Sequence, residues 1–76
     1  MTNEITKLQI LGKNIQKFRK EKNLSQNELA EQLGISREHL AKIETAKRCI
    51  SLKLLFRLSE VLEVPEYKLF DFDIKE

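Results

Sequence analysis

A single glycine, Gly34, separates two short stretches with helical apolar spacing, and this arrangement most limits the folds open to the chain. Before it, Leu29 and Leu33 are four residues apart; after it, Leu40 and Ile43 are three apart. Apolar residues at these spacings line one face of an α-helix. A tight turn between two helices needs one left-handed residue, and glycine adopts that conformation without a steric penalty. The pattern therefore predicts two helices joined by a turn at residues 34–36.

Small and polar residues at fixed places support the same interpretation. Ala30 supplies the small side chain that two steeply crossing helices need at their closest approach. Ser25 and Glu28 form a capping-box pattern at the start of the first helix, and Ser36 is placed to cap the second. Residues 26–45 are therefore predicted to form a helix-turn-helix unit, with a motif core of about residues 25–45.

A further helix is predicted before this unit. It carries an apolar stripe at spacings of three and four, formed by Leu8, Leu11, Ile15 and Phe18. Its start is left between Asn3, a possible N-cap, and Ile10. Gly12 in its interior is expected to cost roughly 1 kcal/mol against alanine. The helix should end near Asn23, because asparagine tolerates the left-handed conformation.

Two more helices are predicted after the unit. Ser51 caps a helix from Leu52 to about Glu63, whose expected inward residues are Leu52, Leu55, Leu58 and Leu62. Pro65 begins a short helix through about Phe70, and residues 71–76 are expected to form a loose tail. Two glycines and one proline in 76 residues argue against a sheet-and-turn fold. We predict an all-α, compact five-helix domain spanning residues 1–76.

Composition excludes several classes of protein. One cysteine precludes an internal disulfide framework, and no apolar run has the length of a membrane span, so we expect a cytoplasmic protein without a membrane partner. One histidine, no glycine-rich phosphate loop and no metal-ligand spacing argue against an enzyme, a metal site or a cofactor. Residues 1–48 carry ten basic and six acidic side chains, whereas residues 49–76 carry four and six. The basic half suggests an anionic partner.

The chain resembles the Cro/phage-repressor type (XRE-like) helix-turn-helix family over about residues 12–70. The residues that carry the resemblance are Leu24-Ser25-Gln26, Glu28-Leu29-Ala30, Leu33-Gly34-Ile35-Ser36, Ile43-Glu44, Lys47-Arg48 and Ser51-Leu52. Ala46 stands where a glycine commonly follows the recognition helix, and Cys49-Ile50 replaces the usual Asn-Pro. The resemblance implies a lambda-repressor-like domain that binds duplex DNA, usually as a two-fold dimer, and regulates transcription.

The second helix of the unit is the expected reading element. With Leu40 and Ile43 inward, the outward residues are Arg37, Glu38, Ala41 and Lys42. Arginine and lysine bind guanine O6 and N7, glutamate accepts from cytosine N4, and alanine contacts the thymine methyl. The alternative is an ordinary solvated face, on which Glu38 and Lys42 pair with each other.

Phosphate contacts are expected at both ends of the unit. The candidates are Ser25, Gln26, His39, Thr45, Lys47 and Arg48. A helix N-terminus offers free N–H donors to phosphate at Ser25 and Gln26, although Ser25 also serves as an N-cap. Gln26 is expected to have no packing role, and His39 is equally compatible with a plain surface position. Lys13, Lys17 and Lys20 are expected to form a solvated face, from which one lysine could touch phosphate.

Structural roles are predicted for four residues: Ala30, Gly34, Arg19 and Glu44. The resemblance implies a salt bridge between Arg19 and Glu44 that fixes the orientation of the recognition helix. Surplus apolar residues predict a homodimer interface formed by Leu54, Tyr67, Phe70, Phe72 and Ile74. Phe56 and Phe70 are the residues most expected to complete the core instead, and Cys49 is expected to be half-buried.

The predicted function is a sequence-specific DNA-binding transcriptional regulator, a dimeric repressor reading a palindromic operator. A phage-type repressor, a restriction–modification controller and an antitoxin fit equally well. The alternative is a protein-interaction module or antitoxin that keeps the fold and acts mainly through a protein partner, in keeping with the modest net charge of +2.

Overall fold

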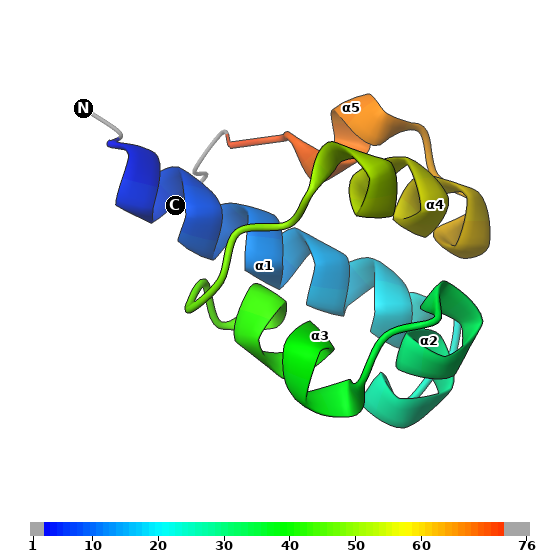
Figure 1. The fold of residues 1–76 in the computed structure, drawn as a ribbon. Coiled ribbons are helices and arrows are strands. Elements are labelled where there is room, and N and C mark those ends of the chain that lie inside the picture. The colour runs from blue at the N-terminus through cyan, green and yellow to red at the C-terminus, as the bar shows by residue number, and fades with distance from the viewer. Residues whose placement is uncertain (1–2, 73–76) are drawn as a thin grey trace.

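Four of the five helices begin at a polar residue whose side chain accepts a hydrogen bond from the first turn. The computed structural model describes residues 3–72 and contains α1 (Glu4–Glu21), α2 (Gln26–Leu33), α3 (Arg37–Glu44), α4 (Leu52–Leu62) and α5 (Glu66–Leu69) (Figure 1). The N-caps of the first four helices are Asn3, Ser25, Ser36 and Ser51. The all-α, five-helix prediction is confirmed, and α1 begins at the earlier of the two expected starts.

Residues with a left-handed backbone conformation lie at or just after the ends of α1, α2 and α4. Asn23, Gly34 and Glu63 have φ values of 58°, 73° and 58°, respectively. Ala46, which stands where the family commonly has glycine, also adopts this conformation, with φ of 63°. The segment after α3 therefore turns as a glycine would turn it, at the steric cost that an alanine Cβ imposes there.

The helices surround one apolar core. The main packing partners are α1 with α3 and α5, α2 with α3 and α4, and α4 with α5. Figure 1 shows the long α1 running between the α2–α3 pair and the α4–α5 pair. The buried apolar residues are Leu11, Ile15, Leu29, Ala30, Leu33, Leu40, Ile43, Leu54, Leu55, Leu58, Leu62 and Leu69. This packing fixes α3 against α1 and α2 while its other side remains exposed.

The inward face of α4 differs from the prediction. Leu54 is 7% exposed and belongs to the core, so its assignment to a dimer interface was wrong. Leu52 was expected inward but is 68% exposed, and Phe56 is 52% exposed. Leu54, Leu58 and Leu62 lie on successive turns of the buried stripe together with Leu55, whereas Leu52 and Phe56 are four residues apart on another face.

The chain beyond α5 is held against α1 as far as the structure describes it. The Asn14 side-chain amide donates to the carbonyls of Leu69 and Asp71 at 2.9 and 3.1 Å. Phe72 is half-buried against the core, and its ring meets that of Phe70 edge-on. Asp71 and Phe72 are therefore docked rather than loose.

Three other predictions meet different outcomes. Phe70 is 41% exposed rather than a core residue. Cys49 is exposed, not half-buried. Ile74, predicted at the interface, lies outside the described residues. None of the helices within residues 3–72 is both long and apolar enough to cross a membrane.

Candidate nucleic-acid interface

The turn between α2 and α3 is closed by backbone hydrogen bonds and by a side chain from α4. Gly34 takes φ 73° and ψ 30°, which lets the Ile35 N–H donate to the Ala30 carbonyl at 3.0 Å. The Arg57 guanidinium donates to the Leu33 carbonyl at 2.7 Å, satisfying an acceptor at the end of α2. The two helices are thereby held in one mutual orientation, which the rest of the site requires.

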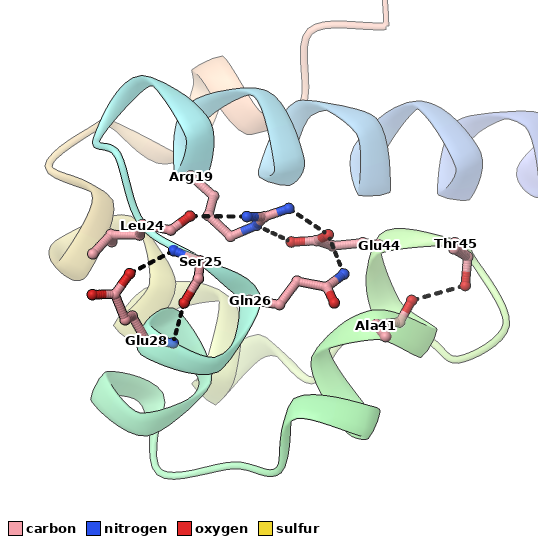
Figure 2. A network of polar contacts seen from close by, with 8 residues as sticks. All are labelled: Arg19, Leu24, Ser25, Gln26, Glu28, Ala41, Glu44 and Thr45. Atoms are coloured by element: carbon pink, nitrogen blue, oxygen red, sulfur yellow. Dashed lines mark hydrogen bonds and ion pairs between the residues drawn. The ribbon is translucent and has the colours of Figure 1, made fainter.

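A buried polar network ties α3 to α1 and α2. Figure 2 shows Arg19 and Glu44 pointing toward one another, with Arg19 Nε 2.8 Å from Glu44 Oε2 and Nη2 3.3 Å from Oε1. The remaining guanidinium donor Nη1 reaches the Leu24 carbonyl at 2.9 Å. Both side chains of the pair are less than a tenth exposed. Within the described residues, no buried side-chain nitrogen or oxygen lacks a hydrogen-bond partner.

Gln26 belongs to this network, contrary to the expectation that it has no packing role. Its side-chain amide donates to Glu44 Oε1 at 2.9 Å and is half-buried (Figure 2). Glu44 therefore receives donors from α1 and α2 together. This arrangement fixes the end of α3 and leaves Gln26 at the first turn of α2.

Gly12 sets the distance between α1 and the end of α3. A Cβ built there would lie 2.4 Å from the Glu44 carbonyl oxygen and 2.8 Å from that of Ile43. No flexible side chain can move aside, because the neighbours are backbone atoms. The glycine that the sequence presented as a helix-weakening residue is thus required by close approach, which lets the Arg19–Glu44 pair form.

The outward side of α3 carries the predicted base-reading residues. Arg37, Glu38 and Lys42 are exposed, whereas Ala41 is half-buried. Glu38 and Lys42 are brought together with Ser36, His39 and Arg48 around a shallow hollow of about 310 Å³. Arg37 and Ala41 do not line it. Two basic side chains (Lys42 and Arg48), the acidic side chain of Glu38 and the imidazole of His39 therefore lie together on one side of α3.

The candidate phosphate contacts differ in how much of their hydrogen-bonding capacity is used internally. Ser25 accepts from the Glu28 N–H at 3.0 Å, which leaves its hydroxyl proton unused by the cap. The Thr45 hydroxyl donates to the Ala41 carbonyl at 2.8 Å, so a phosphate contact through that proton requires breaking this bond (Figure 2). Lys47 and Arg48 have exposed side chains, while their N–H groups donate to the Lys42 carbonyl.

Two surface carboxyls have perturbed acidity. The pKa of Glu28 is lowered, first by the backbone N–H of Ser25 and then by its hydroxyl. Hydrogen bonding to Lys22 and the attraction of its charge lower the pKa of Glu63. Within residues 3–72, no group of three or more histidine, cysteine or acidic side chains is arranged to hold a metal ion.

Sequence reasoning missed the structural roles of three residues that hold the helix-turn-helix unit in place. Gly12 carried a signal, because it lies seven residues before Arg19 and so on nearly the same face of α1. Gln26 and Arg57 carried none, since their partners lie on other helices. Spacing along one helix does not report such contacts.

Comparison with known proteins agrees with this geometry. A family model described as helix-turn-helix matches residues 15–69. An HTH-type transcriptional regulator of Archaeoglobus fulgidus is 36% identical over 62 residues, which cover 82% of this chain and 87% of that protein. SinR of Bacillus subtilis is 36% identical over 63 residues, covering 82% of this chain and 57% of SinR. The chain thus spans little more than half of SinR.

Solved structures share the fold. The restriction–modification controller protein C.AhdI of Aeromonas hydrophila superposes with a TM-score of 0.79 at 30% identity, covering 83% of this chain and 96% of that one. SinR in complex with DNA superposes with a TM-score of 0.75 at 37% identity, covering 80% of this chain and 98% of the other. The chain belongs to the Cro/phage-repressor type (XRE-like) helix-turn-helix family, a family of DNA-binding transcriptional regulators rather than enzymes.

Proposed function

We propose that the chain is a sequence-specific repressor that binds duplex DNA as a homodimer, with α3 in the major groove of a palindromic operator. The observation that carries the proposal is the asymmetry of α3. Its inner side is fixed by Leu40, Ile43 and the Arg19–Glu44 pair, while Arg37, Glu38 and Lys42 are exposed on the other side. A rigid helix with exposed hydrogen-bonding side chains suits major-groove recognition.

Each exposed residue has a chemical role in this proposal. Arg37 and Lys42 donate to guanine O6 and N7, Glu38 accepts from cytosine N4, and Ala41 contacts a thymine methyl. Ser25, Gln26, His39, Thr45, Lys47 and Arg48 hold the backbone of the same duplex. Such contacts contribute affinity and salt dependence without selecting a sequence.

The proposed dimer surface combines exposed apolar residues of α4 and α5. Leu52, Phe56, Tyr67 and Phe70 are all more than two-fifths exposed. Leu52 and Phe56 take the place of the buried Leu54, while Tyr67 and Phe70 belong to the interface as predicted, and Phe72 lies beside Phe70. A second copy covering these side chains would remove apolar surface from water and set two α3 helices about one DNA turn (~34 Å) apart.

Selection of bound duplexes from a random DNA library at two salt concentrations tests the proposal. A palindrome with half-sites about one turn apart is the expected result. Arg37→Ala and Lys42→Ala should each weaken binding to the selected site by about 1–3 kcal/mol and relax selection at one base position. Salt-sensitive binding without selection, or no binding at low salt, would overturn the proposal.

A protein partner is a second candidate function. SinR has also been solved in complex with the SinI protein, and that structure superposes here with a TM-score of 0.75 at 37% identity. In this alternative the chain keeps the fold and acts mainly through a protein partner. The alternative is supported if Arg37→Ala and Lys42→Ala abolish DNA binding but leave the binding of a protein partner unchanged.

A duplex-DNA partner would place the chain in the cytoplasm, at the nucleoid.

A further inference from the structure

A groove lined by residues with polar side chains extends the proposed DNA surface onto α1. It has a volume of about 370 Å³ and lies between α1 and the end of α3. Its lining residues are Gln9, Lys13, Gln16, Gln26, Glu44 and Thr45. We call it the α1–α3 groove. Because Gln26 and Thr45 are candidate phosphate contacts, the groove is continuous with the surface formed by α2 and α3.

The α1–α3 groove presents positive charge and amide donors. Its acid, Glu44, is buried and has both carboxylate oxygens bonded to Arg19, with Gln26 on one of them. Lys13 is exposed, and it takes part in neither of the ion pairs found within residues 3–72. Gln9 and Gln16 lie one turn before and one turn after it on α1. The unneutralised charge of the groove is therefore that of Lys13.

The lining of the α1–α3 groove is held on a rigid element. Gly12 brings the α1 backbone against the Glu44 carbonyl, one residue before Lys13. Arg19 ties the same helix to Glu44 two turns further on. Thr45, the residue that follows α3, lines the groove together with Gln9 and Lys13 of α1. Lys13 is thus carried at a fixed position beside Thr45 and does not depend on a loop.

We propose that Lys13, flanked by Gln9 and Gln16, is a DNA-positioning residue that contacts a backbone phosphate next to those held by Gln26 and Thr45. This inference rests on the proposed function, because it assigns a further part of the same duplex-binding surface. The helix preceding the helix-turn-helix unit then takes part in binding directly, in addition to supporting α3 from behind.

Lys17, one turn along α1, provides the matched comparison. Its ammonium lies 5.3 Å from the centroid of the Phe18 ring. It lines a different hollow, beside α5, with Asn14, Phe18, Glu21, Tyr67, Lys68 and Asp71. The two lysines have the same charge on the same helix. Only Lys13 shares a groove with candidate phosphate contacts.

Salt titration of DNA binding tests the inference. Lys13→Gln, Lys13→Arg and Lys17→Gln are compared with the unaltered chain on a selected duplex by fluorescence anisotropy, after thermal melting has shown that each variant folds. Lys13→Gln should reduce the slope of log K against log salt by about 1 per protomer. It should weaken binding about fivefold to tenfold per protomer near 0.1 M salt. Lys13→Arg should preserve both quantities, and Lys17→Gln should leave the slope unchanged.

The outcomes separate this inference from the proposed function. If the unaltered chain binds no duplex, the proposed function fails and the inference fails with it. If the chain binds and Lys42→Ala weakens binding, but Lys13→Gln behaves as Lys17→Gln does, the inference alone is overturned. Equal losses in Lys13→Gln and Lys17→Gln would indicate a general effect of net charge and would also overturn it.

Discussion

Two polar networks meet at the start of α2, and they differ in burial (Figure 2). In one, Arg19 and Glu44 pair with side chains only 8% and 2% exposed. In the other, the exposed capping box, Glu28 Oε1 accepts from the Ser25 N–H at 2.8 Å and Ser25 Oγ accepts from the Glu28 N–H at 3.0 Å. In both networks a glutamate carboxylate accepts a hydrogen bond of 2.8 Å.

The difference shows that similar hydrogen bonds serve different purposes in different surroundings. Water can replace a lost partner in the exposed capping box, so that network mainly determines where α2 begins. The pair is largely shielded from water, so removing one partner leaves a poorly compensated charge in the interior. The buried network joins three helices, and it therefore governs how α3 is oriented.

Removing Arg19 should have the largest effect on stability. Arg19→Met keeps the length of the side chain but leaves Glu44 without its charged partner, which should lower the free energy of unfolding by about 3–5 kcal/mol. Urea unfolding followed by circular dichroism measures the loss. Lys20→Met, an exposed neighbour on α1, should stay within about 0.5 kcal/mol of the unaltered chain. A loss below 1 kcal/mol for Arg19→Met would show that the pair is not structurally important.

The double variant Arg19→Met, Glu44→Met separates stability from orientation. Replacing a buried ion pair by apolar residues of similar volume is often neutral or stabilising, so the double variant should regain most of the lost stability. It should still bind DNA more weakly than the unaltered chain, because the hydrogen bonds that orient the end of α3 are gone. Full recovery of DNA affinity would contradict the orienting role.

Gly12→Ala should have the next largest effect. Alanine is the better helix former, yet its Cβ would lie 2.4 Å from the Glu44 carbonyl oxygen, so α1 and α3 must separate. We expect a net loss of about 1–3 kcal/mol, typical of overpacking. Unfolding measurements on Gly12→Ala and on Lys17→Ala, an exposed control on the same helix, provide the test. A gain in stability would mean that the helices separate at no cost.

Gly12 also shows what the sequence could and could not predict. The five helices follow from local signals: four polar N-caps, apolar spacings of three and four, one glycine turn, and Pro65 at the start of α5. These signals act between residues close in the chain, so a single sequence contains them. The cost assigned to Gly12 was the intrinsic one, because its place on the Arg19 face of α1 indicates that a neighbour lies there but not how closely the backbone of that neighbour approaches.

The errors in the site have the same physical origin. Gln26 bonds to Glu44, eighteen residues away, and Arg57 bonds to Leu33, twenty-four away. Leu52 and Phe56 looked like core residues because apolar character does not say which stripe of α4 is covered. The Arg19–Glu44 pair was anticipated only through the family resemblance, since its partners are twenty-five residues apart.

Ser25→Ala tests the exposed capping box and should have a smaller effect. It removes the acceptor for the Glu28 N–H, and loss of an N-cap of this kind costs about 1 kcal/mol. The loss is measured by urea unfolding, with Asn27→Ala as a control at an exposed position of the first turn. Amide shifts in the first turn of α2 should change, whereas those of Glu44 and Thr45 should not. Movement of the α3 signals would show that the two networks are not independent.

The pKa of Glu28 gives the finest test. Because folding lowers this pKa, the carboxylate contributes stability above the ordinary glutamate pKa, and the contribution is lost as the pH falls through the folded value. Ser25→Ala should raise the pKa of Glu28 only in part, since the larger cause is the Ser25 backbone N–H, which the substitution keeps. Glu63 is the internal control: its pKa is lowered by Lys22, so it should respond to Lys22→Met and not to Ser25→Ala. NMR titration of both carboxyls in the two variants measures this. Equal shifts of Glu28 and Glu63 in either variant would mean that a general field, and not the hydrogen bonds of each site, sets these pKa values.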